Sequence, residues 1–252
     1  MRGVQIWRSG SIHSYPEEHF APVVSCLVWG AMSEWELGEM ASCHAMMGEG
    51  ISLAKELNDK NSLAIALNFA AQLAENEGNS AEVDRLASDL IELSTRHNFV
   101  YWGALGAIYR GWARSASGDT VKGVPWIEHG IRDYRATGAM LSLPYLLALK
   151  AKALYLADRT SEALEAISEA EALVESFEER RWCAELHRLS GVFLSAMGAD
   201  ETQIEASFCE AISIARKQKS VSLEKRTEAT YAEYHRQKAS GSGRRGFRLP
   251  LC

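Results

Sequence analysis

The sequence predicts an all-α solenoid of about five helix pairs followed by a capping helix. Turn-forming residues recur every 40 positions, at Gly38, Gly78, Gly118, Asp158 and Gly198. A small residue precedes each turn by seven positions: Ala31, Ala71, Gly111, Ala151 and Gly191. A side chain without bulk at one helical position indicates that another helix passes close by. The two periodic features together predict a stack of helix pairs with no strands.

The second half of each repeat is also predicted to be a helix. Apolar or small residues follow the turns at spacings of 4 and 3, which places them on one helical stripe, with Ala199 as one extra residue in the last turn. Hydroxyl side chains can accept from free backbone N–H groups at helix starts, and we expect this at Ser80, Thr120, Thr160 and Thr202. Residues that tolerate the left-handed conformation are expected to end the second helices, at Asn58, Asn98 and Gly138.

The repeat divides the chain into segments. Residues 1–19 lack the pattern, and residues 240–252 are rich in Gly and Arg, which predicts a disordered basic tail without an assigned function. The predicted helix pairs are 20–58, 60–98, 99–138, 139–177 and 178–219, with a capping helix at 220–239.

Composition argues against several classes of partner. The formal net charge is −6, from 27 basic and 33 acidic residues, so nucleic acid is not an expected partner. The longest apolar stretch, 20–32, is too short to cross a bilayer, and the first residues lack the apolar region of a secretory signal. The five cysteines form no CxxC pair and are read as small buried residues of a reducing compartment. We therefore expect a cytoplasmic protein that contacts no membrane.

The sequence carries no catalytic or metal-binding motif. Its seven histidines form no HExxH pattern, and there is no GxSxG elbow and no GxxxxGK[ST] loop. The many carboxylates of 162–175 alternate with an apolar stripe, which is typical of a solvated helix face. We expect no cofactor, no metal and no enzymatic activity.

The order of small, turn and bulky apolar positions in each repeat resembles the tetratricopeptide repeat (TPR), over about 200 residues. The resemblance implies a right-handed α–α superhelix. The period of 40 residues differs from the roughly 34 of that repeat, and the proline near the end of each unit is missing. The longer helices of the MalT-like TPR arrays of bacterial regulators are the closer match.

A narrower resemblance lies in three segments, 185–191, 205–216 and 222–226. They are similar to the C-terminal TPR region of bacterial multidomain regulators, in which an adenylate/guanylate cyclase domain or a DNA-binding domain precedes an ATPase module and the repeats. The resemblance implies a sensory role for this chain, with the catalytic chemistry of those proteins lying upstream of the repeats.

The concave side of such a superhelix is the expected binding surface. Transferring the groove positions of the TPR repeat gives Met32, Trp35, Asn68, Gln72, Ile108, Trp112, Lys152, Tyr155 and Arg188. Aromatic residues and arginine are enriched at binding hot spots. The alternative interpretation is that long helices simply pack these side chains between neighbouring units.

Three functional hypotheses follow. The first is a non-catalytic interaction module of a bacterial signalling system that binds a peptide, a protein or a small effector in its concave groove. The second is the sensor portion of an ATPase-linked cyclase or transcription regulator, whose partner is its own upstream module. The third is a structural scaffold that self-associates through its terminal units, and this hypothesis predicts assembly without a ligand.

Overall fold

The structure is a computed structural model that describes residues 21–239. It confirms an all-α, TPR-like superhelix, and no strand occurs within that range. The expectations for residues 1–19 and 240–252 fall outside the described residues. The helices, with the short 3₁₀ helix η1, are α2 (Pro22–Leu37), α3 (Met40–Glu56), α4 (Lys60–Asn76), α5 (Ser80–His97), α6 (Val100–Ala116), α7 (Thr120–Ala136), α8 (Leu143–Leu156), α9 (Thr160–Phe177), η1 (Arg180–Trp182), α10 (Cys183–Met197), α11 (Glu201–Gln218) and α12 (Val221–Ala239).

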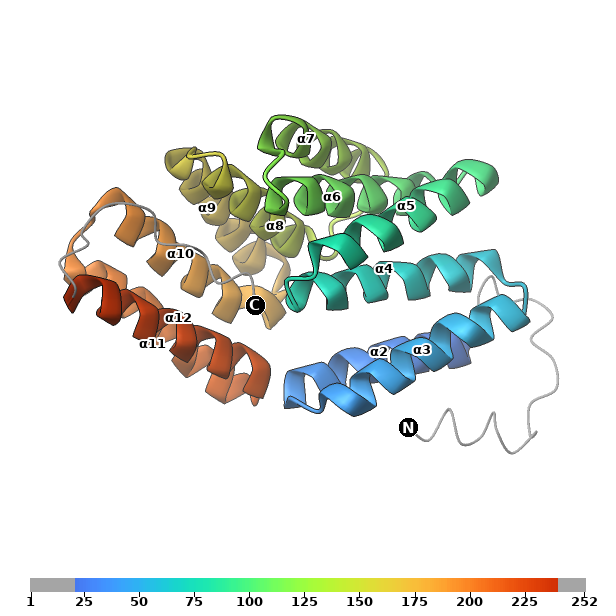
Figure 1. Cartoon of the computed structure of the whole chain (residues 1–252), viewed down its shortest axis with the longest axis horizontal. Coiled ribbons are helices and arrows are strands. Elements are labelled where there is room, and N and C mark those ends of the chain that lie inside the picture. The colour runs from blue at the N-terminus through green and yellow to red at the C-terminus, as the bar shows by residue number, and fades with distance from the viewer. Residues whose placement is uncertain (1–20, 240–252) are drawn as a thin grey trace.

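The helix pairs follow one another in an arc, so that the last helix returns to the first. Figure 1 shows this path from α2 and α3 through α6 and α7 to α11 and α12. Ser222 Oγ on α12 donates to the carbonyl oxygen of Trp35 on α2 at 2.5 Å. The adjacent Ser220 hydroxyl donates to the carboxylate of Glu36. The concave side is therefore a nearly closed interior.

The turns of the 40-residue repeat have the backbone conformation that the sequence predicts. A positive φ occurs at all five turn positions, and Asp158, at 59°, adopts it without being glycine, as Asp and Asn do more readily than other residues. The three predicted ends of second helices also have a positive φ. The glycines among the turns are Gly38, Gly78, Gly118 and Gly198, and the helix ends are Asn58, Asn98 and Gly138.

The predicted hydroxyl caps at the starts of the second helices are wrong. Ser80, Thr120 and Thr160 are the first residues inside their helices, and Thr202 is the second residue of its helix. The oxygen that accepts from the helix belongs to an Asn or Asp just before the helix, because an Asx side chain there reaches the free N–H groups. The side-chain oxygens accept from backbone N–H groups: Asn79 from Glu82 (3.1 Å), Asp119 from Lys122 (3.3 Å) and Asp200 from Thr202 (2.8 Å). The exception is α9, where Arg159 precedes the helix and makes no side-chain cap.

The small residues before the turns lie where helices approach most closely. Ala31, Ala71 and Ala151 are fully buried. A β-carbon added at Gly111 on α6 would lie 2.7 Å from the carbonyl oxygen of Gly123 on α7. That distance is shorter than a van der Waals contact with backbone allows, so this position requires glycine.

None of the helices within residues 21–239 is both long and apolar enough to cross a membrane.

Candidate functional site

The first helices of the pairs form the candidate site on the concave side. A cavity of about 260 Å³ lies between α2, α4, α6 and α8, with no contribution from the second helices. Figure 1 shows α4, α6 and α8 on the inner side of the arc. The side chains around the cavity are Ser25, Trp29, Ile65, Asn68, Phe69, Gln72, Tyr101, Trp102, Leu105, Tyr109, Leu141, Ser142, Tyr145 and Leu146.

Six of the fourteen residues around the cavity are aromatic. Trp29 on α2 and Phe69 on α4 meet with ring centroids 4.5 Å apart and planes tilted by 59°. Tyr101 and Trp102, at the start of α6, make an edge-to-face pair at 4.6 Å. Trp102 is fixed further because its Nε1 donates to Asn61 Oδ1 at 2.9 Å. The wall is therefore aromatic and held in place by contacts between successive repeats.

The polar groups of the cavity are few and uncharged. Asn68 is 8% exposed, and its side-chain oxygen has no hydrogen-bond partner. Gln72, one helical turn later on α4, is 4% exposed. No Asp, Glu, Lys, Arg or His is among the lining residues. A buried amide oxygen without a donor costs about 1–3 kcal/mol relative to a satisfied one.

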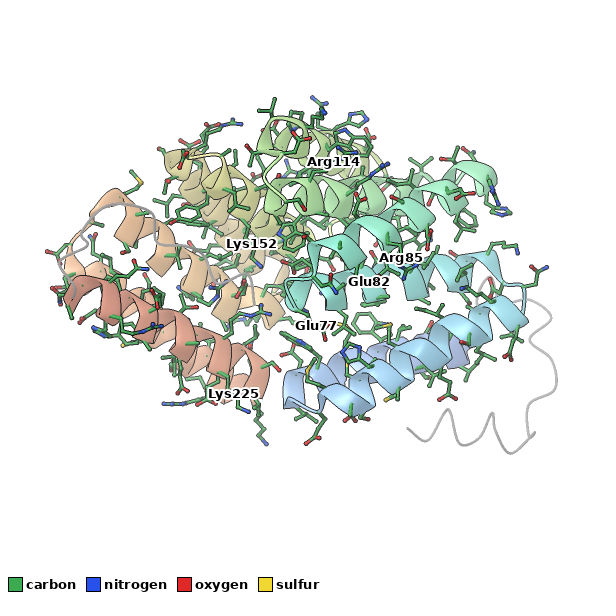
Figure 2. The ribbon with its side chains drawn as sticks, in the orientation of Figure 1. Glu77, Glu82, Arg85, Arg114, Lys152 and Lys225 are labelled. Carbon is green, nitrogen blue, oxygen red and sulfur yellow. The ribbon has the colours of Figure 1, made fainter. Side chains whose placement is uncertain are left out.

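A buried charge network lies behind this cavity and joins α4, α8 and α10. Tyr145 donates its phenolic hydrogen to Glu75 Oε2 at 3.0 Å, which links the cavity wall to the network. Lys152 Nζ lies 3.0 Å from Glu75 Oε1 and 2.8 Å from Glu185 Oε1. Glu185 also receives two hydrogen bonds, each of 2.8 Å, from the guanidinium of Arg188. Figure 2 shows Lys152 in the middle of the molecule.

The charges of this network determine how Glu185 ionises. Burial opposes ionisation of the carboxyl, but the neighbouring Arg188 and Lys152 outweigh it and hold the pKa of Glu185 well below its usual range. Burial raises the pKa of Tyr145 well above its usual range, and Glu75 raises it further, so Tyr145 stays a neutral donor. The network is therefore ionised at Glu185 and neutral at the wall of the cavity.

The network continues to α12 and so to the closure of the arc. Arg188 Nη1 donates to Thr230 Oγ1 at 3.1 Å, and Arg226 Nη1 lies 3.8 Å from Glu185 Oε2. The guanidinium of Arg226 also lies over the ring of Trp35 on α2, 5.3 Å from its centroid. These contacts connect the last helix to the interior and to the first helix.

A second cavity, of about 390 Å³, lies where the two ends of the arc meet. It is lined by α2, η1 and the residues that join α11 to α12. Trp29 lines both cavities, so the two are neighbours. Arg181 Nε lies 3.4 Å from Glu36 Oε1 in the lining of this second cavity, so it contains an ion pair that the first cavity lacks.

The predicted groove residues are distributed between cavity walls and solid interior. Asn68 and Gln72 line the aromatic cavity, and Met32 lines the second one. Tyr155 is half-buried and packs on Phe193, with ring centroids 5.0 Å apart. The remaining positions are packed inside, none more than 5% exposed: Trp35, Ile108, Trp112, Lys152 and Arg188.

The cavity aromatics were not among the predicted site residues, although the sequence contains a signal for them. Trp29, Phe69 and Tyr109 are 40 residues apart, as are the positions 25, 65, 105 and 145. Each row therefore occupies its own helical position in successive repeats. The two positions are one helical turn apart and face the same side of the superhelix. Bulky aromatics at one repeat position, close to a row of polar residues at 68 and 72, would have indicated this cavity.

The arrangement offers binding chemistry. Within residues 21–239, no group of three or more His, Cys, Asp or Glu side chains could hold a metal ion. The buried carboxylates, Glu75 and Glu185, are engaged by Tyr145, Lys152 and Arg188. The aromatic cavity can enclose an apolar group and offers it a hydrogen-bond acceptor at Asn68.

Comparisons with known proteins place the chain among helical-repeat folds. No protein-family model matches it. Uncharacterized protein R02095 of Rhizobium meliloti (strain 1021) is 24% identical over 203 residues, which are 81% of this chain and 20% of that protein, so the chain spans about a fifth of the relative's length. The crystal structure of the apo form of RapI superposes with a TM-score of 0.60 at 11% identity, covering 95% of this chain and 92% of RapI. That likeness concerns the fold alone.

Proposed function

We propose that the chain is a non-catalytic TPR-like interaction module that binds a peptide, a protein or a small effector on its concave side. The aromatic cavity between α2, α4, α6 and α8 is the observation that carries this proposal. Concave, largely apolar sites with a few placed polar groups are the usual form of a ligand site. The groove positions Asn68 and Gln72 contribute amide groups to it.

The same proposal includes a bacterial signalling role in the cytoplasm. Cys26, Cys43, Cys183 and Cys209 are free thiols, which is compatible with a reducing compartment, but the expectation that the cysteines are buried is wrong for Cys26 and Cys209, which are exposed. The cavity spans four successive repeats, so an occupant would contact several helices at once. Binding there can change how the repeats sit on one another, which is what a signalling module needs.

A variant that fills the cavity tests the proposal. Ser25 lines the cavity and is half-buried, and Cys26 beside it on α2 is exposed and does not line the cavity. The Ser25→Trp and Cys26→Trp variants therefore add the same side chain inside and outside the site. Wild type and both variants are incubated with bacterial lysate, and the co-purifying proteins and small molecules are identified by mass spectrometry.

The comparison has a definite expected result. We expect one molecule to be retained by wild type and Cys26→Trp and lost from Ser25→Trp, with all three equally helical by circular dichroism. Equal retention by all three would place the binding surface elsewhere. Concentration-dependent assembly of the wild type without any ligand, measured by light scattering, would instead favour a self-associating scaffold.

A second candidate function is the sensor portion of an ATPase-linked adenylate/guanylate cyclase or transcription regulator. The observation that favours it is the relative from Rhizobium meliloti, of which this chain matches only about a fifth. On this hypothesis the partner is an upstream module of the same regulator. DNA sequence adjoining the gene tests it: a reading frame with a GxxxxGK[ST] phosphate-binding loop supports the sensor, and its absence favours an independent module.

A further inference from the structure

The chemistry of the aromatic cavity defines the kind of molecule that fits it. We propose that the cavity binds a small uncharged molecule with an aromatic ring and one hydrogen-bond donor, of the indole or phenol class. This inference rests on the proposed function, because it names the ligand of that same site. The size, the aromatic wall, the lack of charge and the unsatisfied amide each restrict the ligand.

Size restricts the ligand to a small molecule. The cavity has a volume of about 260 Å³. Sites for drug-sized ligands usually have about 300–1,000 Å³, so this one is at or below the lower limit. It can hold one bicyclic ring but not an extended peptide.

The wall favours an aromatic ligand. Trp29 and Phe69 present ring faces and edges from α2 and α4, and Tyr101 and Trp102 present theirs from α6. Aromatic rings prefer tilted or offset contacts at centroid distances of about 4.5–7 Å, which add about 0.5–1.5 kcal/mol per pair beyond area burial. An aliphatic ligand of equal size would gain only the free energy of burying its apolar surface.

The absence of charge excludes ionised ligands. No charged side chain lines the cavity. The carboxylate of Glu75 behind the wall is occupied by Tyr145 and Lys152. That of Glu179 accepts from the backbone N–H of Ser142. An ammonium or carboxylate group would therefore lose its hydration without gaining a counter-ion. A neutral ligand avoids this cost.

The unsatisfied amide specifies the polar group. The side-chain oxygen of Asn68 is buried and has no donor, and Asn68 lines the cavity. The phenol of Tyr145 is not available, because it donates to Glu75. An N–H or O–H on the ligand would pair with the Asn68 oxygen and remove its desolvation cost.

Titration calorimetry with matched probes tests the inference on the whole chain. The probes are indole, 1-methylindole without the donor, tryptamine with a positive charge, indole-3-acetate with a negative charge, and glucose without an aromatic ring. We expect indole to bind most tightly, 1-methylindole on the order of fivefold more weakly, and the other three without detectable heat. Equal affinity for indole and 1-methylindole, tighter binding of a charged probe or of glucose, or no binding of indole would each overturn the inference.

Two variants of buried amides identify the residue that pairs with the donor. Asn68→Leu removes the cavity oxygen. Asn76→Leu is the matched control, because Asn76 is equally buried on the same helix and has an unpaired side-chain nitrogen but does not line the cavity. We expect Asn68→Leu to bind indole and 1-methylindole equally and Asn76→Leu to keep the fivefold preference. Loss of the preference for indole in both variants would contradict the assignment to Asn68. If Asn68→Leu does not fold, the binding of the five probes to the wild type still decides the ligand class.

The result also separates this inference from the function on which it rests. If the Ser25→Trp variant loses a natural ligand but wild type ignores indole, the binding site stands and the ligand class is wrong. If Ser25→Trp retains every ligand of the wild type, the proposed function itself fails.

Discussion

At the scale of single residues, the interior charges are the least replaceable part of the molecule. Glu75 and Glu185 balance Lys152, Arg188 and Arg226, so three cations share two carboxylates. Glu185 contacts all three of these cations. Breaking a buried pair leaves an uncompensated charge, which costs about 3–5 kcal/mol. The groove positions Lys152 and Arg188 therefore have a structural role within this network.

Replacing Glu185 by glutamine tests this role. We expect the Glu185→Gln variant to lose about 3–5 kcal/mol of unfolding free energy, because Lys152 keeps only Glu75 as a counter-charge and the two arginines lose theirs. Urea unfolding monitored by circular dichroism measures the loss. The control is Glu82→Gln, which removes an exposed ion pair with Arg85 on α5. This variant should lose at most about 1 kcal/mol of unfolding free energy. Figure 2 labels both residues on that outer helix. Similar losses in the two variants would contradict the account.

The same carboxylate predicts a dependence of stability on pH. The pKa of Glu185 is held well below its usual range in the folded protein. A carboxyl whose pKa is lowered by folding stabilises the protein above its unfolded pKa, about 4.3, and this contribution is lost as the pH falls toward the folded pKa. The stability difference between wild type and Glu185→Gln should therefore be largest near neutral pH and shrink below about pH 4. Urea titrations from pH 7 to pH 3 would refute this if the difference stayed constant.

At the scale of helices, the repeat pattern was sufficient to predict most of the secondary structure. Five turns 40 residues apart were predicted from the sequence, and all have a positive φ. The capping residues were wrong by one or two positions, because Ser or Thr and a neighbouring Asn or Asp are both good caps and only the local backbone decides between them. The period identifies a helix, but it does not identify its first residue.

The closest helix contact gives a prediction at this scale. A β-carbon at Gly111 would meet the backbone of α7, at Gly123 O (2.7 Å) and Ile127 N (2.9 Å). We expect the Gly111→Ala variant to lose about 1–3 kcal/mol of unfolding free energy, because α6 and α7 must move apart.

Gly48 supplies the matched control for this variant. It lies in the exposed part of α3, with nothing within 4 Å of an added β-carbon. The Gly48→Ala variant should gain about 0.5–1 kcal/mol, since alanine is the better helix former. Thermal and urea unfolding of both variants measure the effects, and a stabilised Gly111→Ala would show that the close approach of α6 and α7 is absent.

At the scale of the whole molecule, the closure of the arc could not be predicted from the sequence. Nearest-neighbour packing of repeats is local and follows from the period, whereas the return of α12 to α2 depends on the summed curvature of all the pairs. This closure covers Trp35 and Arg188, predicted for an open groove, because both contact residues of α12. The aromatic cavity and the second cavity remain between the helices, and the aromatic residues of the first recur with the period of the repeat.

Hydrogen–deuterium exchange of the whole chain, with and without the molecule that wild type retains, tests the central claim most directly. Binding in the aromatic cavity should slow exchange in the first helices α2, α4, α6 and α8, which line it, and leave the outer helices α5, α7 and α9 unchanged. Protection confined to α5, α7 and α9 would contradict the claim, because it would place the partner on the opposite side of the superhelix.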